Sequence, residues 1–187
     1  TLFRSWRELR VRHFIKDLEV ATVAEDDKKL EELISQYQRN KNSYLFEGKN
    51  KKLEETIEKA KEIASKKKMA YNQLVTAMEK RNKNLLDSAI KNSMAFNSLA
   101  TLRMKASQLI VQIENEEKCK TQIMEALRER DIQKIKQAIA IAEENGIVEG
   151  ISSAKSMVEK LEEEKMLREK LEIFIKTKDR NKILNSG

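Results

Sequence analysis

The sequence predicts an all-α fold, arranged as an elongated rod of overlapping three-helix bundles. Its 187 residues include no proline and only four glycines, so little interrupts long helices. Apolar residues make up 40% and charged residues 37%, which suits narrow helical seams better than one large core. A pattern also repeats about every 49 residues: Leu74, Ala77, Met78, Arg81, Asn82, Leu86, Ala89 and Ile90 reappear as Ile123, Ala126, Leu127, Arg130, Asp131, Ile135, Ala138 and Ile139, and Leu171, Ile175, Asp179 and Ile183 begin a further copy.

Each repeat contains a short helix, expected over 28–40, 83–95 and 132–144, with apolar residues at spacings of three and four. Each short helix is preceded by a residue whose side-chain oxygen can accept hydrogen bonds from the first amides of the helix. A further residue of this kind predicts another helix start near the C-terminus. The expected N-caps are Asp27, Asn82, Asp131 and Asp179. Residue types that tolerate the left-handed conformation follow the short helices, and we expect turns at Gly48, Asn97 and Gly146.

Long helices are expected over 50–80, 98–129 and 147–178, and each carries two apolar stripes separated by a short charged segment, here called the waist. The waists are residues 66–68, 114–118 and 162–165. Each long helix can therefore contribute one half to one bundle and the other half to the next.

This sharing divides the chain into bundles over 1–65, 66–115 and 116–163, with the start of a fourth repeat over 164–187. Each repeat should lengthen the rod by roughly 27 Å at 1.5 Å per residue, because its long helix runs forward further than its short helix runs back. The arrangement resembles a spectrin-type rod, in which one helix runs uninterrupted from one three-helix bundle into the next.

The first fifteen residues form a basic amphipathic segment that is similar to part of an IQ motif and to the segment leaving a myosin neck. Four residues match the motif's leading aliphatic position, its two basic positions and its closing hydrophobic position: Leu2, Arg7, Arg12 and Ile15, while Phe3 and Glu8 stand where glutamine and glycine are expected. The resemblance implies that this segment binds calmodulin or a light chain. It also implies that the rest of the chain is a lever-arm extension or proximal tail of an unconventional, cytoskeletal myosin motor.

The residues expected to contact such a partner are Leu2, Phe3, Trp6, Arg7, Arg10, Arg12, Phe14 and Ile15. The same helical spacing also fits the buried stripe of a first helix, and a basic amphipathic helix with one Trp can lie on an anionic membrane or enter a partner groove. The sequence leaves these alternatives open.

Charge and chemistry exclude several functions. The net charge of +7 is spread over lysines interleaved with glutamates, which is typical of solvated helix faces and disfavours nucleic-acid binding. The one histidine, His13, and the one cysteine, Cys119, are far apart in the sequence, so we expect no catalytic pair, no metal site, no cofactor and no small-molecule substrate. The lack of a long apolar run and of a secretory leader favours the cytoplasm, and the motor resemblance adds cytoskeletal association.

The sequence therefore predicts a structural rod or spacer that is not an enzyme and that can bind protein partners along its side. The alternative is a helical adaptor whose N-terminal basic helix binds calmodulin, a light chain, another protein or anionic lipid.

Overall fold

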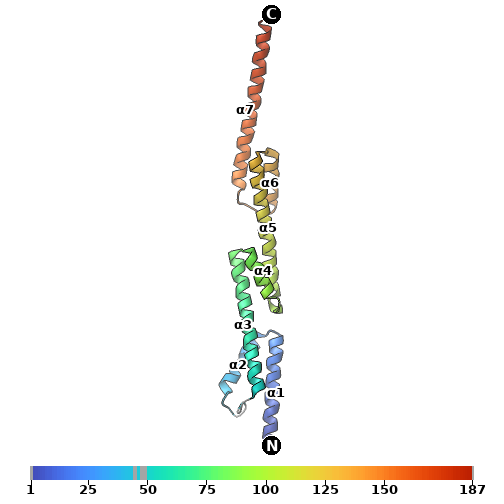
Figure 1. Ribbon diagram of the computed structural model, residues 1–187, viewed down its shortest axis with the longest axis vertical. Helices are drawn as coiled ribbons and strands as arrows, with labels where there is room; N and C mark the ends of the chain where they lie inside the picture. Colours follow the sequence, from blue (N-terminus) through green and yellow to red (C-terminus); the bar gives the residue numbers. More distant parts are fainter. Residues whose placement is uncertain (1, 44–45, 47–49, 187) are drawn as a thin grey trace. The chain divides into compact units, whose positions relative to one another are not determined.

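The computed structural model describes residues 2–43, 46 and 50–186, and over these residues the chain is all-α, with no strand. Figure 1 shows the order of the elements. The helices are α1 (Leu2–Val23), α2 (Asp27–Asn40), α3 (Lys51–Lys80), α4 (Lys83–Asn92), the 3₁₀-helix η1 (Asn97–Leu99), α5 (Ala100–Glu129), α6 (Ile132–Glu144) and α7 (Ile151–Leu184). The all-α prediction is confirmed, and the short and long helices fall close to their expected ranges.

The chain divides into two compact units, Thr1–Ile110 and Val111–Gly187. The division falls within α5, which is one α-helix from Ala100 to Glu129.

The first half of unit 1 is built from α1, α2 and the N-terminal half of α3. In this region α1 packs on both α2 and α3. Phe46 from the α2–α3 connection enters the same core and makes edge-to-face contacts with Phe14 and Tyr37, at centroid distances of 5.2 and 5.4 Å. The buried members of this core are Val11, Phe14, Ile15, Leu18, Ala21, Leu30, Leu33, Phe46, Leu53, Ile57 and Ala60.

The second half of unit 1 uses the C-terminal half of α3, which packs against α4. Buried residues are Ala70, Leu74 and Ala77 on α3, and Leu86 and Ala89 on α4. Helix α3 therefore carries one buried stripe on each side of its waist, and the two stripes face different neighbours.

Unit 2 has a core formed by the C-terminal half of α5, by α6 and by the N-terminal half of α7. Ile135 on α6 is completely buried, and Ala142 and Ala154 are also fully enclosed. The buried members are Cys119, Ile123, Ala126, Ile135, Ala138, Ile139, Ala142, Ile147, Ile151, Ala154, Val158 and Leu161. From residue 162 to residue 186 every described side chain on α7 and its cap is exposed.

Three of the expected cap and turn residues lie where the sequence placed them. Asn82 caps α4 and Asp131 caps α6, each through a side-chain oxygen that accepts amide hydrogen bonds. Gly146 adopts the left-handed conformation after α6, with a φ of 69°. Its amide donates to the carbonyl of Glu143, and the amide of Ile147 donates to that of Ala142, which closes the helix.

Other expected positions need correction. Asp26, rather than Asp27, caps α2, because its side chain accepts from the amide of Lys29 while Asp27 is the first helical residue. Asp179 caps no helix start here, because α7 continues through it to Leu184. Asn97 is the first residue of η1 and has no positive φ. The expected turn at Gly48 lies outside the described residues.

The α4–η1 turn contains no left-handed residue. The side chain of Arg103, rather than a left-handed Asn97, holds this turn closed. The Arg103 guanidinium donates hydrogen bonds to the backbone carbonyls of Ser93 and Phe96, at 2.6 and 2.7 Å. Ser93, which is fully buried, donates its hydroxyl to the carbonyl of Ile90 at 2.9 Å. These side-chain bonds reinforce the turn, because the same three carbonyls also accept backbone amides, from Phe96, Leu99 and Ser93 respectively.

Candidate functional site

The N-terminal helix divides the expected partner residues into a buried group and an exposed group. Phe14 and Ile15 lie in the core of unit 1. Leu2 and Phe3 are 86% and 74% exposed. Trp6 is about half exposed, and the guanidinium of Arg10 lies 5.0 Å from the centre of its ring. Arg7 is half-buried and Arg12 is exposed. The accessible part of this surface is therefore the first three turns of α1.

The most regular feature of the chain is a helix break that occurs three times with the same geometry. Glu25, Arg81 and Arg130 each take up a left-handed conformation, with φ values of 53°, 48° and 53°. The amide of each donates to the carbonyl three residues earlier, at 3.2 Å in all three cases. The next residue is the N-cap of the following short helix: Asp26, Asn82 and Asp131 respectively.

The same three caps also place a buried apolar residue at a fixed distance along the chain. Leu30, Leu86 and Ile135 each lie four residues after a cap and donate their amides to the cap carbonyl, at 3.0, 2.9 and 2.9 Å. All three side chains are buried. Each break therefore redirects the chain and presents the first core residue of the short helix in one step.

A left-handed residue other than glycine costs about 1–2 kcal/mol, so surrounding contacts must stabilise each break. At the first break, the carboxylate of Glu25 accepts hydrogen bonds from the amide and hydroxyl of Ser98, at 2.9 and 3.0 Å. The waist residue Lys67 donates to the carboxylate of Asp27 at 2.9 Å and to the backbone carbonyl of Glu25 at 3.2 Å. Its side chain is only 12% exposed.

The third break is also held by ion pairs to a waist, but the positive and negative partners are exchanged. Arg130 forms a hydrogen-bonded ion pair with both carboxylate oxygens of Glu164 on the waist of α7, at 2.9 and 3.2 Å. Lys136 pairs with Glu162 on the same waist at 2.6 Å. A basic waist thus faces an acidic break in unit 1, and an acidic waist faces a basic break in unit 2. The first and third waists are therefore contact sites for helix breaks as well as interruptions of the apolar stripe.

The ionisable groups with displaced pKa values belong to surface ion pairs. A hydrogen bond to Glu129 followed by its Coulomb attraction raises the pKa of Lys134 beside the third break. A hydrogen bond from Lys66 lowers the pKa of Glu62 on α3. Both groups are solvated, so these shifts describe local pairing and indicate no acid–base catalyst.

The chemically reactive residues are dispersed. His13 is exposed on α1, and Cys119 is 3% exposed in the core of unit 2. Within the described part of the chain, His, Cys, Asp and Glu side chains form no group of three or more that could hold a metal ion.

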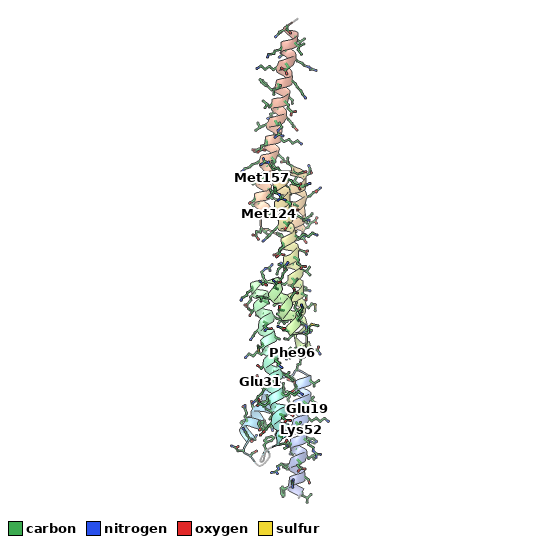
Figure 2. The ribbon with its side chains drawn as sticks, viewed as in Figure 1. Glu19, Glu31, Lys52, Phe96, Met124 and Met157 are labelled. Carbon is green, nitrogen blue, oxygen red and sulfur yellow. The ribbon has the colours of Figure 1, made fainter. Side chains whose placement is uncertain are left out.

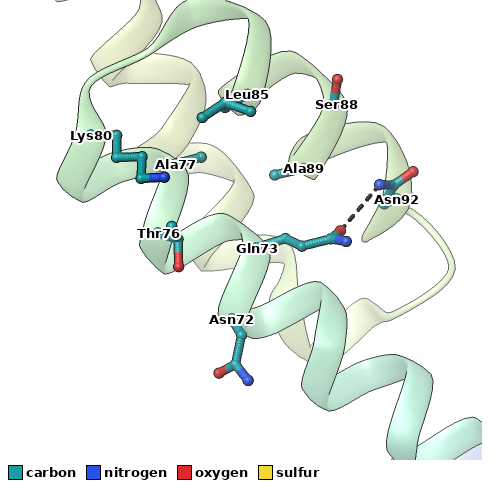
Figure 3. A pocket seen from close by; sticks show the side chains of 9 residues that line it. All are labelled: Asn72, Gln73, Thr76, Ala77, Lys80, Leu85, Ser88, Ala89 and Asn92. Atoms are coloured by element: carbon teal, nitrogen blue, oxygen red, sulfur yellow. Dashed lines mark hydrogen bonds between the residues drawn. The ribbon is translucent and has the colours of Figure 1, made fainter.

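The described residues of unit 1 line several shallow grooves. The first, of about 360 Å³, runs between α3 and α4, where Asn92 donates to Gln73 at 3.1 Å (Figure 3). The second, of about 720 Å³, lies beside the first break and is lined by residues from α2, the waist of α3 and η1. These two grooves are open surface depressions between packed helices.

Comparisons with protein-family models, with curated proteins and with solved structures found no match to this chain. No helix among the described residues combines the length and the apolar character that crossing a bilayer requires.

Proposed function

We propose that this chain is a helical spacer, in which long helices are shared between successive small three-helix bundles and hold flanking modules apart. The observation that carries the proposal is the double use of α3. Its N-terminal half packs in one core with α1 and α2, and its C-terminal half packs with α4. A helix that belongs to two cores transmits its direction from one to the next, as a flexible loop would not.

The helix breaks support a mechanical role. Helices α1, α3 and α5 each end at a break that reverses the chain. The breaks at Glu25 and Arg130 are tied to a waist or to the next turn by ion pairs and hydrogen bonds. Ties of this kind restrain bending at the point where a helical repeat is otherwise weakest. A lever-arm extension or proximal tail of a cytoskeletal motor is the particular spacer that the IQ-like N-terminal segment suggests.

Stiffness can be tested by a distance measurement between two spin labels. Met69 and Met166 are 59% and 51% exposed, and they lie beside the first and third waists. In a Cys119→Ala background, cysteines at these two positions should give one narrow distance distribution centred at roughly 50 Å, which is two repeat advances. A matched variant with two glycines inserted in the 114–118 waist should broaden it. A broad distribution in the parent chain would contradict the proposal.

A second candidate function rests on the exposed start of α1. Leu2, Phe3, Trp6 and Leu9 leave apolar surface accessible beside several arginines, which suits an acidic helical groove such as that of calmodulin. Titration with calcium–calmodulin should then shift the emission of Trp6, and Phe3→Ala should weaken the titration. An unchanged emission spectrum at micromolar protein concentration would exclude this adaptor function.

A further inference from the structure

Helix α1 carries a second, largely apolar stripe on the side opposite its core, here called the outer stripe. Its members recur at alternating spacings of four and three residues, and all are exposed: Leu2, Trp6, Leu9, His13, Lys16, Val20 and Val23. Leu9 and Val20 each lie two residues from a buried residue, Val11 or Leu18, which is roughly 200° around the helix. Figure 2 shows side chains of α1 projecting on a side where neither α2 nor α3 lies.

The spacing of the outer stripe is that of a coiled-coil seam. Alternating steps of four and three residues keep a narrow row of side chains on one side of a helix, where a second helix can cover it. The core of unit 1 is made by the other side of α1, which contributes Val11, Phe14, Ile15, Leu18 and Ala21. Folding of unit 1 therefore leaves the outer stripe uncovered, although Leu9 and Val20 are 51% and 59% exposed apolar side chains.

The charges beside the outer stripe indicate which helix would cover it. Arg10 and Arg12 flank its N-terminal half, whereas Asp17 and Glu19 flank its C-terminal half, and all four are exposed. This distribution is self-complementary, because a second copy that runs in the opposite direction brings acidic flanks to basic ones. An anionic membrane or a uniformly acidic groove would instead meet the carboxylates of Asp17 and Glu19 with repulsion.

The antiparallel register follows from the same positions. With His13 opposite the partner's Lys16, Leu9 lies opposite the partner's Val20, and Trp6 lies opposite the partner's Val23. This register places Arg10 beside the partner's Asp17 and Arg12 beside the partner's Glu19, and the twofold axis repeats both pairs.

The polar centre of the stripe disfavours the parallel alternative. In a parallel pair, the two Lys16 side chains would face each other across the seam and repel. The antiparallel register separates these two lysines, because each one lies against the partner's His13 instead. The polar residues within the seam therefore select orientation, as a buried polar position does in other coiled coils.

We propose that α1 is an interface between two copies of this chain, which pair in antiparallel orientation along the outer stripe. The inference goes beyond the spacer function and does not depend on it, since it uses the surface of one helix of unit 1. Pairing covers Trp6 and Leu9, so a chain paired in this way cannot bind calmodulin through the same side of α1.

The mass of the full chain in solution tests the interface. In sedimentation equilibrium from micromolar to sub-millimolar concentration, the apparent mass should rise from one chain towards two. Val20→Asp should keep the chain monomeric, because it places a charge against the partner's Leu9. Val148→Asp is the matched control, because Val148 is an 83% exposed valine of unit 2, and it should dimerise like the parent. A parent that stays monomeric throughout, or a Val20→Asp chain that dimerises like the parent, would overturn the proposal.

Exchange of charges tests the orientation. Arg12→Glu should weaken dimerisation about tenfold, because it sets a carboxylate beside the partner's Glu19 at two symmetric places. Adding Glu19→Arg to Arg12→Glu should restore the parent affinity. Restoration by Asp17→Arg instead would indicate a parallel pair, in which Arg12 faces the partner's Asp17, and would overturn the antiparallel register.

Disulfide cross-linking between two variants gives an independent readout of the register. In a Cys119→Ala background, an equal mixture of Leu9→Cys chains and Val20→Cys chains should cross-link under mild oxidation. Either variant alone should not, because the two copies of residue 9 lie roughly 16 Å apart along the pair. Efficient cross-linking of Leu9→Cys alone would contradict the proposal. The spacer function is tested separately in the monomeric Val20→Asp chain, by the distance between positions 69 and 166 and by its scattering.

Discussion

Truncation of Ile135 should destabilise the core of unit 2 without affecting the first core of unit 1. Ile135 is fully buried on α6 among residues from α5, α6 and α7. Shortening a fully buried isoleucine to alanine costs about 2–5 kcal/mol, from lost transfer free energy and from the cavity that remains. Ile135→Asp should unfold the region around 118–161 altogether, because it places an unpaired charge in a narrow core.

The chain's sole cysteine provides the assay. Cys119 is 3% exposed in the same core, so a thiol reagent reaches it only when this region opens. At about 1.4 kcal/mol per factor of ten, a loss of about 2 kcal/mol makes labelling roughly 30-fold faster, and about 5 kcal/mol makes it roughly a few thousand-fold faster.

The controls lie on the same helix and in the other unit. Ile141 is 41% exposed on α6, and Ile141→Ala should change the labelling rate by less than about threefold, since surface substitutions stay within about 0.5 kcal/mol. Hydrogen exchange over α1 should match the parent in the Ile135→Ala variant. An unchanged labelling rate for Ile135→Ala, or an equal loss of protection in α1, would refute the assignment of separate cores.

Three further substitutions test the breaks and turns. Asp131→Ala should lower the free energy of unfolding of unit 2 by about 1 kcal/mol in chemical denaturation, because two backbone amides lose their hydrogen bonds to the cap. Asp179→Ala should have almost no effect on this free energy. A double-mutant cycle of Arg130→Ala and Glu164→Ala should give a coupling of about 0.2–1 kcal/mol that falls in high salt; a coupling of zero at low salt would show that this pair does not tie the break. Arg103→Ala should cost about 1.5–3 kcal/mol in unit 1 by the same denaturation measurement, since two carbonyls lose a charged donor, and a parent-like midpoint would contradict its closing role.

The helices could be predicted from the sequence because their signals are local. Apolar spacing located α2, α4 and α6, and the oxygen-bearing side chains of Asn82 and Asp131 marked two starts correctly. Choosing between Asp26 and Asp27 needed backbone geometry, since adjacent aspartates have the same capping chemistry.

Features that depend on distant partners were missed. Nothing local identifies Arg81 or Arg130 as left-handed, because this conformation disfavours arginine and is stabilised by its surroundings. The pairing of Lys67 with Asp27 joins residues 40 positions apart, and a signal for it existed only in the opposite charges of waist and break. Asp179 carries the same local pattern as Asp131, but its apolar stripe is uncovered here, so the helix continues.

Small-angle scattering of the full chain in solution tests the spacer proposal most directly. If the long helices run forward along the rod and the short ones run back, their lengths at 1.5 Å per residue give a maximum dimension of roughly 120 Å. A radius of gyration near about 16 Å, the value for a compact domain of this length, would contradict the proposal.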